Sequence, residues 1–308
     1  MTSKALFFAL LLFSALSAFA EEEEDDNPGL VMDYYKDTCP QSEDIIKEQV
    51  NQQQQNNAFS WLRNVFHDCF VESYDVSLLL ELTSGMLSEM ETDRSFGMRN
   101  FRYIDTIKEA VERESHYFVS CTDIIVFSGR DGIVALGGPH IPLKTGRRHG
   151  RRSRADILEQ HLPSHNGSLV LCLRGAHSVF FPQCIKLVQR LYPEVDPQLN
   201  PEHVHHILKK CPNSIPDSKA VHYVRNDRGT PMKLDNNYYR NILDNKGLML
   251  VDQLAVDKRT KLYVKKMAKS QHYFFKEFSR AITVLSKNNP LTGTKGEIRK
   301  QLSCQQAL

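Results

Sequence analysis

The chain has 308 residues, and its 39 Lys and Arg against 37 Asp and Glu leave a formal charge of only +2. A chain this close to neutrality lacks the strong basic field of a general nucleic-acid binder, so no nucleic-acid partner is expected. Apolar residues make up 41% of the chain, an ordinary globular share, and outside the N-terminus no apolar run reaches the roughly 18–20 residues of a membrane span.

The first 20 residues predict an export signal. Lys4 supplies a positive start, Ala5–Phe13 an apolar stretch, and Ala18–Ala20 a small-x-small cleavage site. We therefore expect a secreted protein whose remaining part, residues 21–308, forms a single domain without a membrane anchor. Export would also make Asn166, in Asn-Gly-Ser, a glycosylation site.

The rest of the chain shows mostly helical periodicity. The pattern predicts a helix over residues 42–50 that Ser42 caps, and a second helix over residues 103–111. A long amphipathic helix is predicted over residues 264–285. Residues 191–235 are rich in Pro, Asn and Asp and predict irregular structure. Because strand-like alternation is scarce, the predicted fold class is mostly α.

Arg63 and His67 are four residues apart, so on a helix they lie on one face. A base beside a fixed cation suits a reaction that moves a proton and develops negative charge on a neighbouring oxygen. The alternative interpretation is an ordinary solvated helix face.

Two loops are rich in oxygen atoms of the kind that Ca²⁺ prefers. The first loop carries two carboxylates, a hydroxyl and two backbone carbonyls, from Asp68, Asp75, Ser77, Val71 and Ser73. An acidic turn at the end of a helix is the alternative interpretation. The second loop contains Asp227, Thr230, Lys233 and Asp235.

Seven cysteines in an exported chain predict disulfides, and the odd number leaves at least one unpaired. They lie at positions 39, 69, 121, 172, 184, 211 and 304. None belongs to a Cys-x-x-Cys pair, so zinc ribbons, thioredoxin-type sites and c-type haem attachment lack their signatures.

Taken together, the motifs of this chain resemble those of the plant secretory, or class III, haem peroxidases over residues 29–304. The motifs are Tyr34–Pro40, Phe66–Val71, Asp75–Leu80, Val119–Ile124, Gly137–Pro139, Gly146–Arg148, Gly175–Ser178, Leu234–Tyr239 and Pro290–Gly293. The resemblance implies a mostly helical fold with a distal half, about residues 29–165, and a proximal half, about residues 166–304, around one b-type haem. It also implies a monomeric enzyme of the cell wall or extracellular space that reduces hydrogen peroxide with small phenolic donors.

The resemblance assigns roles to five residues. His67 is implied as the distal base that moves a proton of hydrogen peroxide, and Arg63 as the cation that stabilises the developing charge. His177 is implied as the axial ligand of the haem iron, with Asp252 accepting its other ring N–H. Pro163 matches the site of the aromatic donor.

Two Ca²⁺ sites and two disulfides are implied in the same way. The ligands of the first calcium are Asp68, Val71, Ser73, Asp75 and Ser77. The ligands of the second calcium are Ser178, Asp227, Thr230, Lys233 and Asp235. The implied disulfides are Cys121–Cys304 and Cys184–Cys211.

The chain also departs from the family. Ser115 stands where a partner for Cys39 is expected, and Tyr74 where a partner for Cys69 is expected. Two further differences concern the haem environment: Arg94 and Ser95 lie near the place of a missing distal asparagine, and Phe180 replaces a glycine.

The largest departure lies before His177. Only 13 residues separate Pro163 from His177, so one whole helix and most of the helix that carries His177 are expected to be missing. A non-catalytic, calcium-binding scaffold is therefore the alternative to an active peroxidase.

Overall fold

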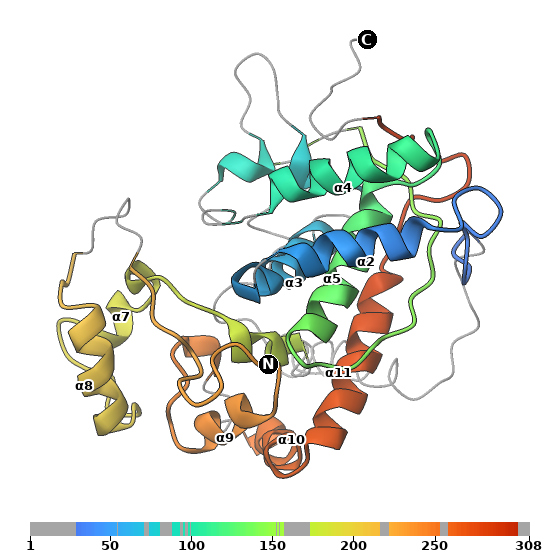
Figure 1. Ribbon diagram of the computed structural model, residues 1–308. Coiled ribbons are helices and arrows are strands. Elements are labelled where there is room, and N and C mark those ends of the chain that lie inside the picture. Colours follow the sequence, from blue (N-terminus) through green and yellow to red (C-terminus); the bar gives the residue numbers. More distant parts are fainter. Residues whose placement is uncertain are drawn as a thin grey trace, which may run out of the picture.

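The computed structural model describes residues 29–53, 55–70, 74–80, 88–92, 95, 98, 100–151, 153, 155–156, 173–215, 222–252 and 258–300. Helices dominate this part of the chain, and the β pairing within it consists of isolated bridges (Figure 1). The predicted mostly α fold is therefore confirmed. None of the helices in these ranges is long and apolar enough to cross a membrane. The predicted export signal and Asn166 lie outside the described residues.

The elements of the N-terminal half are α2 (Ser42–Gln52), α3 (Gln55–Phe70), η1 (Ser77–Leu79), η2 (Glu89–Glu91), α4 (Phe101–Glu114) and α5 (Cys121–Ala135). Those of the C-terminal half are η3 (Leu173–Val179), η4 (Cys184–Lys186), α7 (Val188–Leu191), α8 (Pro201–Lys210), α9 (Asn237–Leu243), η5 (Leu250–Asp252), α10 (Lys258–Lys269) and α11 (Gln271–Ser286). Helix α4 confirms the prediction over residues 103–111.

The start of α2 differs in detail from the prediction. Ser42 is the first helical residue, and the capping position falls to Gln41, which gives no side-chain hydrogen bond. The predicted serine cap is therefore wrong, although the helix itself is confirmed. Glu43 and Asp44 place negative charge in the first turn instead, which favours the positive end of the helix dipole.

The long helix predicted over residues 264–285 is two helices, α10 and α11. Ser270 separates them in an extended conformation, and its side chain accepts a hydrogen bond of 3.1 Å from the Tyr273 backbone N–H. A serine in this position satisfies a backbone donor that the new helix leaves unpaired, so it begins a helix rather than continuing one.

Residues 191–235 are not irregular throughout, because they contain α8. Asn200 caps this helix by accepting a hydrogen bond of 3.2 Å from the His203 backbone N–H, and Pro201 occupies its first position. The Asn and Pro residues that indicated irregular structure are here the start signals of a helix.

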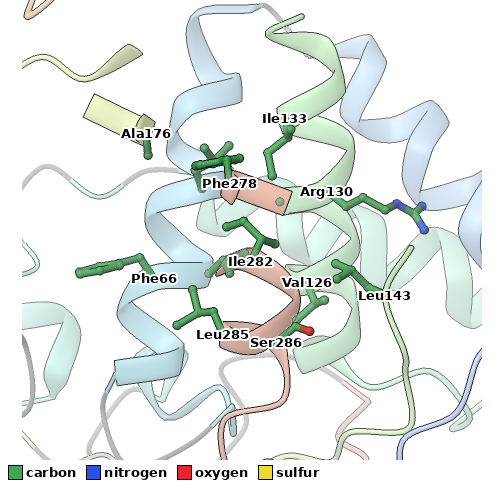
Figure 2. Close-up of a pocket in the computed structure, with 13 residues that line it drawn as sticks. Phe66, Val126, Arg130, Ile133, Leu143, Ala176, Phe278, Ile282, Leu285 and Ser286 are labelled. Carbon is green, nitrogen blue, oxygen red and sulfur yellow. The ribbon is translucent and has the colours of Figure 1, made fainter. Parts of the chain in front are cut away.

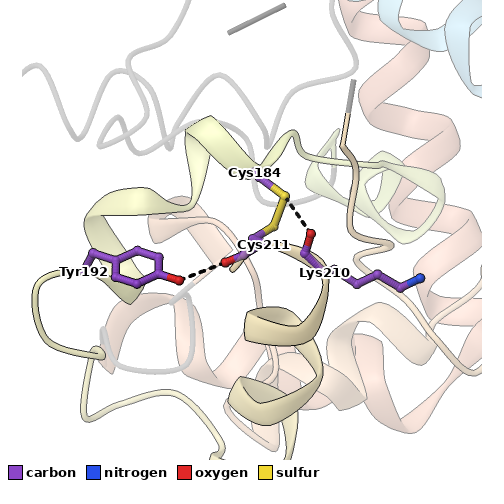
Figure 3. The surroundings of a disulfide bond; sticks show 4 residues. All are labelled: Cys184, Tyr192, Lys210 and Cys211. Atoms are coloured by element: carbon purple, nitrogen blue, oxygen red, sulfur yellow. Dashed lines mark hydrogen bonds between the residues drawn. A yellow bond between two sulfur atoms is a disulfide. The ribbon is translucent and has the colours of Figure 1, made fainter. Parts of the chain in front are cut away.

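The main core forms where α3 packs against α5, with α2, α4 and α11 around them (Figure 1). Gly129 of α5 allows the close approach, because a Cβ atom there would lie 2.4 Å from a methyl group of Val65. Trp61 of α3 is buried in this interface. A second, smaller apolar cluster surrounds α7 and α8 and includes the disulfide Cys184–Cys211 (Figure 3).

An apolar cavity of about 40 Å³ lies between α3, α5 and α11 (Figure 2). We call it the three-helix cavity. Its walls include Leu62, Val126 and Phe278, and Ala176, the residue before His177, borders it. Arg130 also lines the cavity, but its guanidinium points away from it and bonds Glu43 and Asp131. The cavity is thus an apolar space beside the chain segment that carries His177.

Candidate active site

Helix α3 brings Arg63 and His67 together. The Nε atom of Arg63 donates a long hydrogen bond of 3.5 Å to Nε2 of His67. His67 is buried, so the interpretation of this pair as a solvated face is wrong for the histidine. Nε2 of His67 thus faces the guanidinium, an arrangement in which a neutral imidazole accepts the hydrogen bond.

Burial lowers the pKa of Arg63 to about 10, with the nearby Tyr223 acting in the opposite direction. A guanidinium with this pKa still carries its charge at neutral pH. Arg63 can therefore stabilise negative charge at the point where His67 can accept a proton, which is the combination that the sequence indicated.

The 3₁₀ helix η3 carries His177. Its Nδ1 atom lies 2.8 Å from Oδ1 of Asp252, which is buried. Three further donors contact this carboxylate: the Tyr238 hydroxyl at 2.7 Å, the Met249 backbone N–H at 2.8 Å and the Asn226 amide at 3.4 Å. Together they fix the orientation of both Asp252 and the His177 ring.

Burial by itself raises the pKa of Asp252. The charge of His177 and the hydrogen bonds from His177, Tyr238 and Met249 outweigh burial, so the pKa lies below its ordinary value. Asp252 is therefore a carboxylate, and it holds the proton of His177 on Nδ1.

The histidine fits the axial ligation of a haem iron. The bond to Asp252 occupies Nδ1 and leaves Nε2 with a lone pair for a metal, the arrangement found in carboxylate–histidine–metal sites. The His177 side chain is 26% exposed, whereas Asp252 is fully buried. The ring of Phe180, which replaces the family glycine, stacks on His177 with 5.3 Å between centroids.

The segment that follows His177 contacts the distal helix directly. The ring of Phe181 meets the ring of Phe59 on α3 edge to face, with 4.6 Å between centroids. The Arg225 guanidinium covers Phe181 at 5.0 Å. This aromatic contact joins helix α3 to the segment that follows His177.

The first oxygen-rich loop gathers carboxylates in a buried position. Asp68 is fully buried, and its Oδ1 accepts a hydrogen bond of 2.8 Å from the Val76 backbone N–H. Its Oδ2 has no hydrogen-bond partner among the described residues. Burial and the charges of Asp75 and Glu89 raise the pKa of Asp68 well above its usual range. A hard cation would relieve both the repulsion and the unsatisfied oxygen.

Glu89 is linked to the same loop. Its Oε2 accepts a hydrogen bond of 3.2 Å from the Ser77 hydroxyl. Asp75 lies directly against Gly150, where a Cβ atom would come within 2.0 Å of the carboxylate. This position therefore admits no larger residue than glycine while Asp75 keeps its place.

The second oxygen-rich loop is arranged differently. The buried carboxylate of Asp227 already accepts hydrogen bonds from Gly229, Thr230 and Asn237. Oδ1 of Asp235 accepts a hydrogen bond of 2.9 Å from the Asn237 backbone N–H. These bonds hold the loop in shape.

Two hydrogen bonds place Ser178 beside this loop. Asn226, next to Asp227, contacts the backbone oxygens of His177 and Phe180. The buried Ser178 hydroxyl has no hydrogen-bond partner among the described residues, so it remains available to a ligand. Lys233 lies in the same loop, where its backbone N–H bonds the Thr230 carbonyl.

Some expected site residues lie outside the described residues, namely Val71, Ser73 and Pro163. Within the described ranges, no group of three or more His, Cys, Asp and Glu side chains has an arrangement that could hold a metal ion. Both calcium sites therefore remain predictions that depend partly on hydroxyl and backbone oxygens.

The structure contains the disulfide Cys184–Cys211, which closes the second apolar cluster (Figure 3). Cys121 is buried, and its expected partner Cys304 lies outside the described residues, so the disulfide Cys121–Cys304 stays a prediction. Burial raises the pKa of the Cys121 thiol to about 11, while the charges of Lys108 and Arg299 act in the opposite direction.

Ser115 lies next to Cys39, and Tyr74 lies next to Cys69, the two cysteines whose expected disulfide partners are replaced. The Ser115 hydroxyl bonds the carbonyl of Thr38, the neighbour of Cys39. The Tyr74 side chain interacts with the buried thiol of Cys69, whose pKa burial raises to about 12. Its ring also lies under the guanidinium of Arg147, 5.3 Å away.

Sequence reasoning missed three residues that organise the proximal side: Asn226, Asn237 and Tyr238. Asn226 directly precedes Asp227, and the other two belong to the Leu234–Tyr239 motif. For Asn237 and Tyr238, the position inside a recognised motif was the available signal. Asn226 and Tyr238 could not be linked to Asp252, because 26 and 14 residues separate them from it.

Comparison with known proteins agrees with this geometry. The family model described as peroxidase matches residues 42–270. Arabidopsis thaliana Peroxidase 42 is 63% identical over 316 residues and Peroxidase 21 is 48% identical over 315, with 95–96% of each chain covered. Peroxidase 63 of the same plant is 33% identical over 318 residues, covering 96% of this chain and 94% of its own.

The alignment with Peroxidase 42 spans more positions than the 308 residues of this chain. The relative therefore has residues that this chain lacks, in agreement with the short segment before His177. The match nevertheless extends over nearly the whole length of both proteins. The chain belongs to the class III family of plant haem peroxidases.

Proposed function

We propose that this protein is a secreted enzyme that reduces hydrogen peroxide with small phenolic donors, using a b-type haem. Family membership makes the chain a haem peroxidase and favours the enzyme over the non-catalytic scaffold. The observation that carries the proposal is the pairing of His177 with the buried Asp252, in a chain whose helix α3 also holds Arg63 beside the buried His67. The lack of a Cys-x-x-Cys-His motif agrees with a haem that is not attached through cysteines.

The haem, held by Nε2 of His177, would supply the electrons that reduce the peroxide and would take them back from the donors. The roles of the protein's own residues follow from their positions. His67 accepts a proton from hydrogen peroxide at Nε2 and returns it to the departing oxygen, which leaves as water. Arg63 stabilises the negative charge that develops as the O–O bond breaks.

The donors complete the balance of the reaction. One hydrogen peroxide and two phenols give two waters and two phenoxyl radicals, so each phenol loses one electron and one proton. Pro163 is proposed to contact the aromatic donor. A wall or extracellular location would place the enzyme among phenolic substrates of this kind, including lignin precursors.

Replacement of His67 by alanine tests the proposed mechanism. His67→Ala should bind haem like the wild type but lose most of its guaiacol oxidation, because the substitution removes the base beside Arg63. His116→Ala, at an exposed histidine after α4, is the control and should keep full activity. Wild-type turnover by His67→Ala would refute the assignment of the base.

We further propose two bound Ca²⁺ ions. The first would be held by Asp68, Val71, Ser73, Asp75 and Ser77. The second would be held by Ser178, Asp227, Thr230, Lys233 and Asp235. The unsatisfied oxygens of Asp68 and Ser178 support the two sites.

Melting temperatures with and without chelator test the calcium sites. Calcium should stabilise the wild type, because it binds the folded chain and not the unfolded one. Asp68→Asn should lose part of this gain and should tolerate chelator better, since the variant removes one negative charge from the cluster of Asp68, Asp75 and Glu89. The exposed Asp37→Asn serves as the control. A wild-type melting temperature indifferent to chelator would refute both sites.

Secretion, a monomeric state and glycosylation at Asn166 belong to the same proposal. N-terminal sequencing of the exported protein should begin at Glu21. Treatment with a glycosidase should lower the mass of the wild type and leave Asn166→Gln unchanged. An exported protein that retains residues 1–20 would contradict the predicted cleavage.

A further inference from the structure

Tyr238 and His177 share one oxygen atom of Asp252. The Tyr238 hydroxyl donates to Oδ1 at 2.7 Å, and Nδ1 of His177 lies 2.8 Å from the same atom. Tyr238 is buried in α9, and its ring meets the His177 ring edge to face, with 6.0 Å between centroids. The phenol is therefore a direct partner of the carboxylate that orients the implied iron ligand.

The other oxygen of Asp252 is engaged as well. Oδ2 accepts a hydrogen bond of 2.8 Å from the Met249 backbone N–H and a longer one of 3.4 Å from the Asn226 amide. A carboxylate offers about four lone-pair sites, and these four donors match that number. Each added donor reduces the negative charge on the carboxylate oxygens. The hydrogen bond that Asp252 accepts from His177 then becomes weaker.

We propose that Tyr238 is a positioning residue that limits how strongly Asp252 attracts the Nδ1 proton of His177, and so sets the donor strength of Nε2 toward the haem iron. The proposal rests on the proposed ligation by His177. Histidine ligands become more basic when a carboxylate takes up their second ring proton more strongly. A phenol that shares the same carboxylate oxygen weakens this effect.

The consequence concerns the preference of the iron for its oxidation states. A stronger nitrogen donor favours ferric over ferrous iron, because the higher charge gains more from the ligand. Removing the Tyr238 hydroxyl should therefore lower the reduction potential and strengthen the bond between iron and histidine. If Tyr238 had only a structural role, removing its hydroxyl would change neither the reduction potential nor the strength of the iron–histidine bond.

Two variants separate the hydroxyl from the ring. Tyr238→Phe removes the hydrogen bond and keeps the aromatic packing. Tyr239→Phe is the matched control, because Tyr239 is an adjacent buried tyrosine whose ring packs on Phe274. Its hydroxyl is not among the four donors that the described residues direct to Asp252.

The first measurement uses the haem-loaded protein. In Tyr238→Phe the equilibrium should shift about tenfold toward ferric iron, which for one electron is about 59 mV. The iron–histidine stretch in the resonance Raman spectrum should rise in frequency. Tyr239→Phe should match the wild type in both. Unchanged values in Tyr238→Phe, or equal changes in both variants, would overturn the proposal.

The second measurement uses the protein without haem. The Nδ1 proton of His177 should move downfield in the NMR spectrum of Tyr238→Phe, because its bond to Asp252 becomes stronger. An unchanged resonance would overturn the proposal. If the wild type takes up no haem, the proposed peroxidase function fails, and this proton resonance alone decides whether Tyr238 controls the Asp252–His177 bond.

Discussion

The Ser115 hydroxyl donates a hydrogen bond of 2.9 Å to the carbonyl oxygen of Thr38, directly before the buried Cys39. The end of α4 and the N-terminal loop therefore meet where the family resemblance implies a disulfide. In this chain a hydrogen bond makes the connection that a covalent bond makes in the family. Such a bond contributes only about 0.5–1.5 kcal/mol to stability.

Ser115→Cys should restore the missing covalent connection. A new disulfide between Cys39 and the introduced thiol should raise the free energy of unfolding by about 2–4 kcal/mol, because it constrains the unfolded chain. Mass spectrometry under non-reducing conditions would detect the bond, and chemical denaturation would measure the gain. Ser115→Ala, the control, should lose about 1 kcal/mol. A variant that keeps both of these thiols free would show that the two positions do not meet.

Filling the three-helix cavity should stabilise the protein. Val126→Ile adds one methylene group at the wall of this apolar space of about 40 Å³, and burying it should contribute about 0.8 kcal/mol. Val134→Ile adds the same group to an exposed position of α5 and should change little. A loss of stability in Val126→Ile, measured by denaturation against this control, would mean that the cavity cannot accept the added group.

His203 should make the protein sensitive to mild acid. Burial, followed by the charges of Arg228 and His206, lowers the pKa of His203 from 6.5 to about 4. Above pH 6.5 the ring is neutral in both folded and unfolded chains. Between pH 6.5 and 4 the unfolded chain binds a proton at this histidine and the folded chain does not. The free energy of unfolding therefore decreases as the pH is lowered from 6.5 to 4, by up to about 3 kcal/mol.

His203→Gln should reduce this loss, whereas His205→Gln, at an exposed position of the same helix, should keep it. Denaturation curves at pH 7, 6, 5 and 4 would measure the difference. Identical pH dependence in the wild type and His203→Gln would show that another group controls the acid response.

The sequence predicted the helical fold and the main site residues because their signals are local. Arg63 and His67 are one helical turn apart, a recognised motif carries His177, and Asp227 belongs to an oxygen-rich loop. The division between α10 and α11 was missed, because apolar residues keep their helical spacing on both sides of Ser270. The hydroxyl of Ser270 caps the start of α11, and the chain divides there although the apolar spacing continues.

Contacts between distant segments could not be predicted from one sequence. Tyr238 reaches Asp252 because α9 packs its buried face toward the proximal histidine, and no local pattern encodes that distance. The contact of Phe59 with Phe181 likewise depends on how η3 meets α3. The three-helix cavity exists only after three separate helices have packed.

The central claim is that His177, held by Asp252, binds the haem iron in this chain despite the short segment before it. Haem titration of the wild type and of His177→Ala, followed by the Soret band, tests it most directly. We expect stoichiometric binding by the wild type with a five-coordinate high-spin spectrum, and affinity at least tenfold weaker in His177→Ala. Absence of binding by the wild type, or equal affinity in both proteins, would contradict the account.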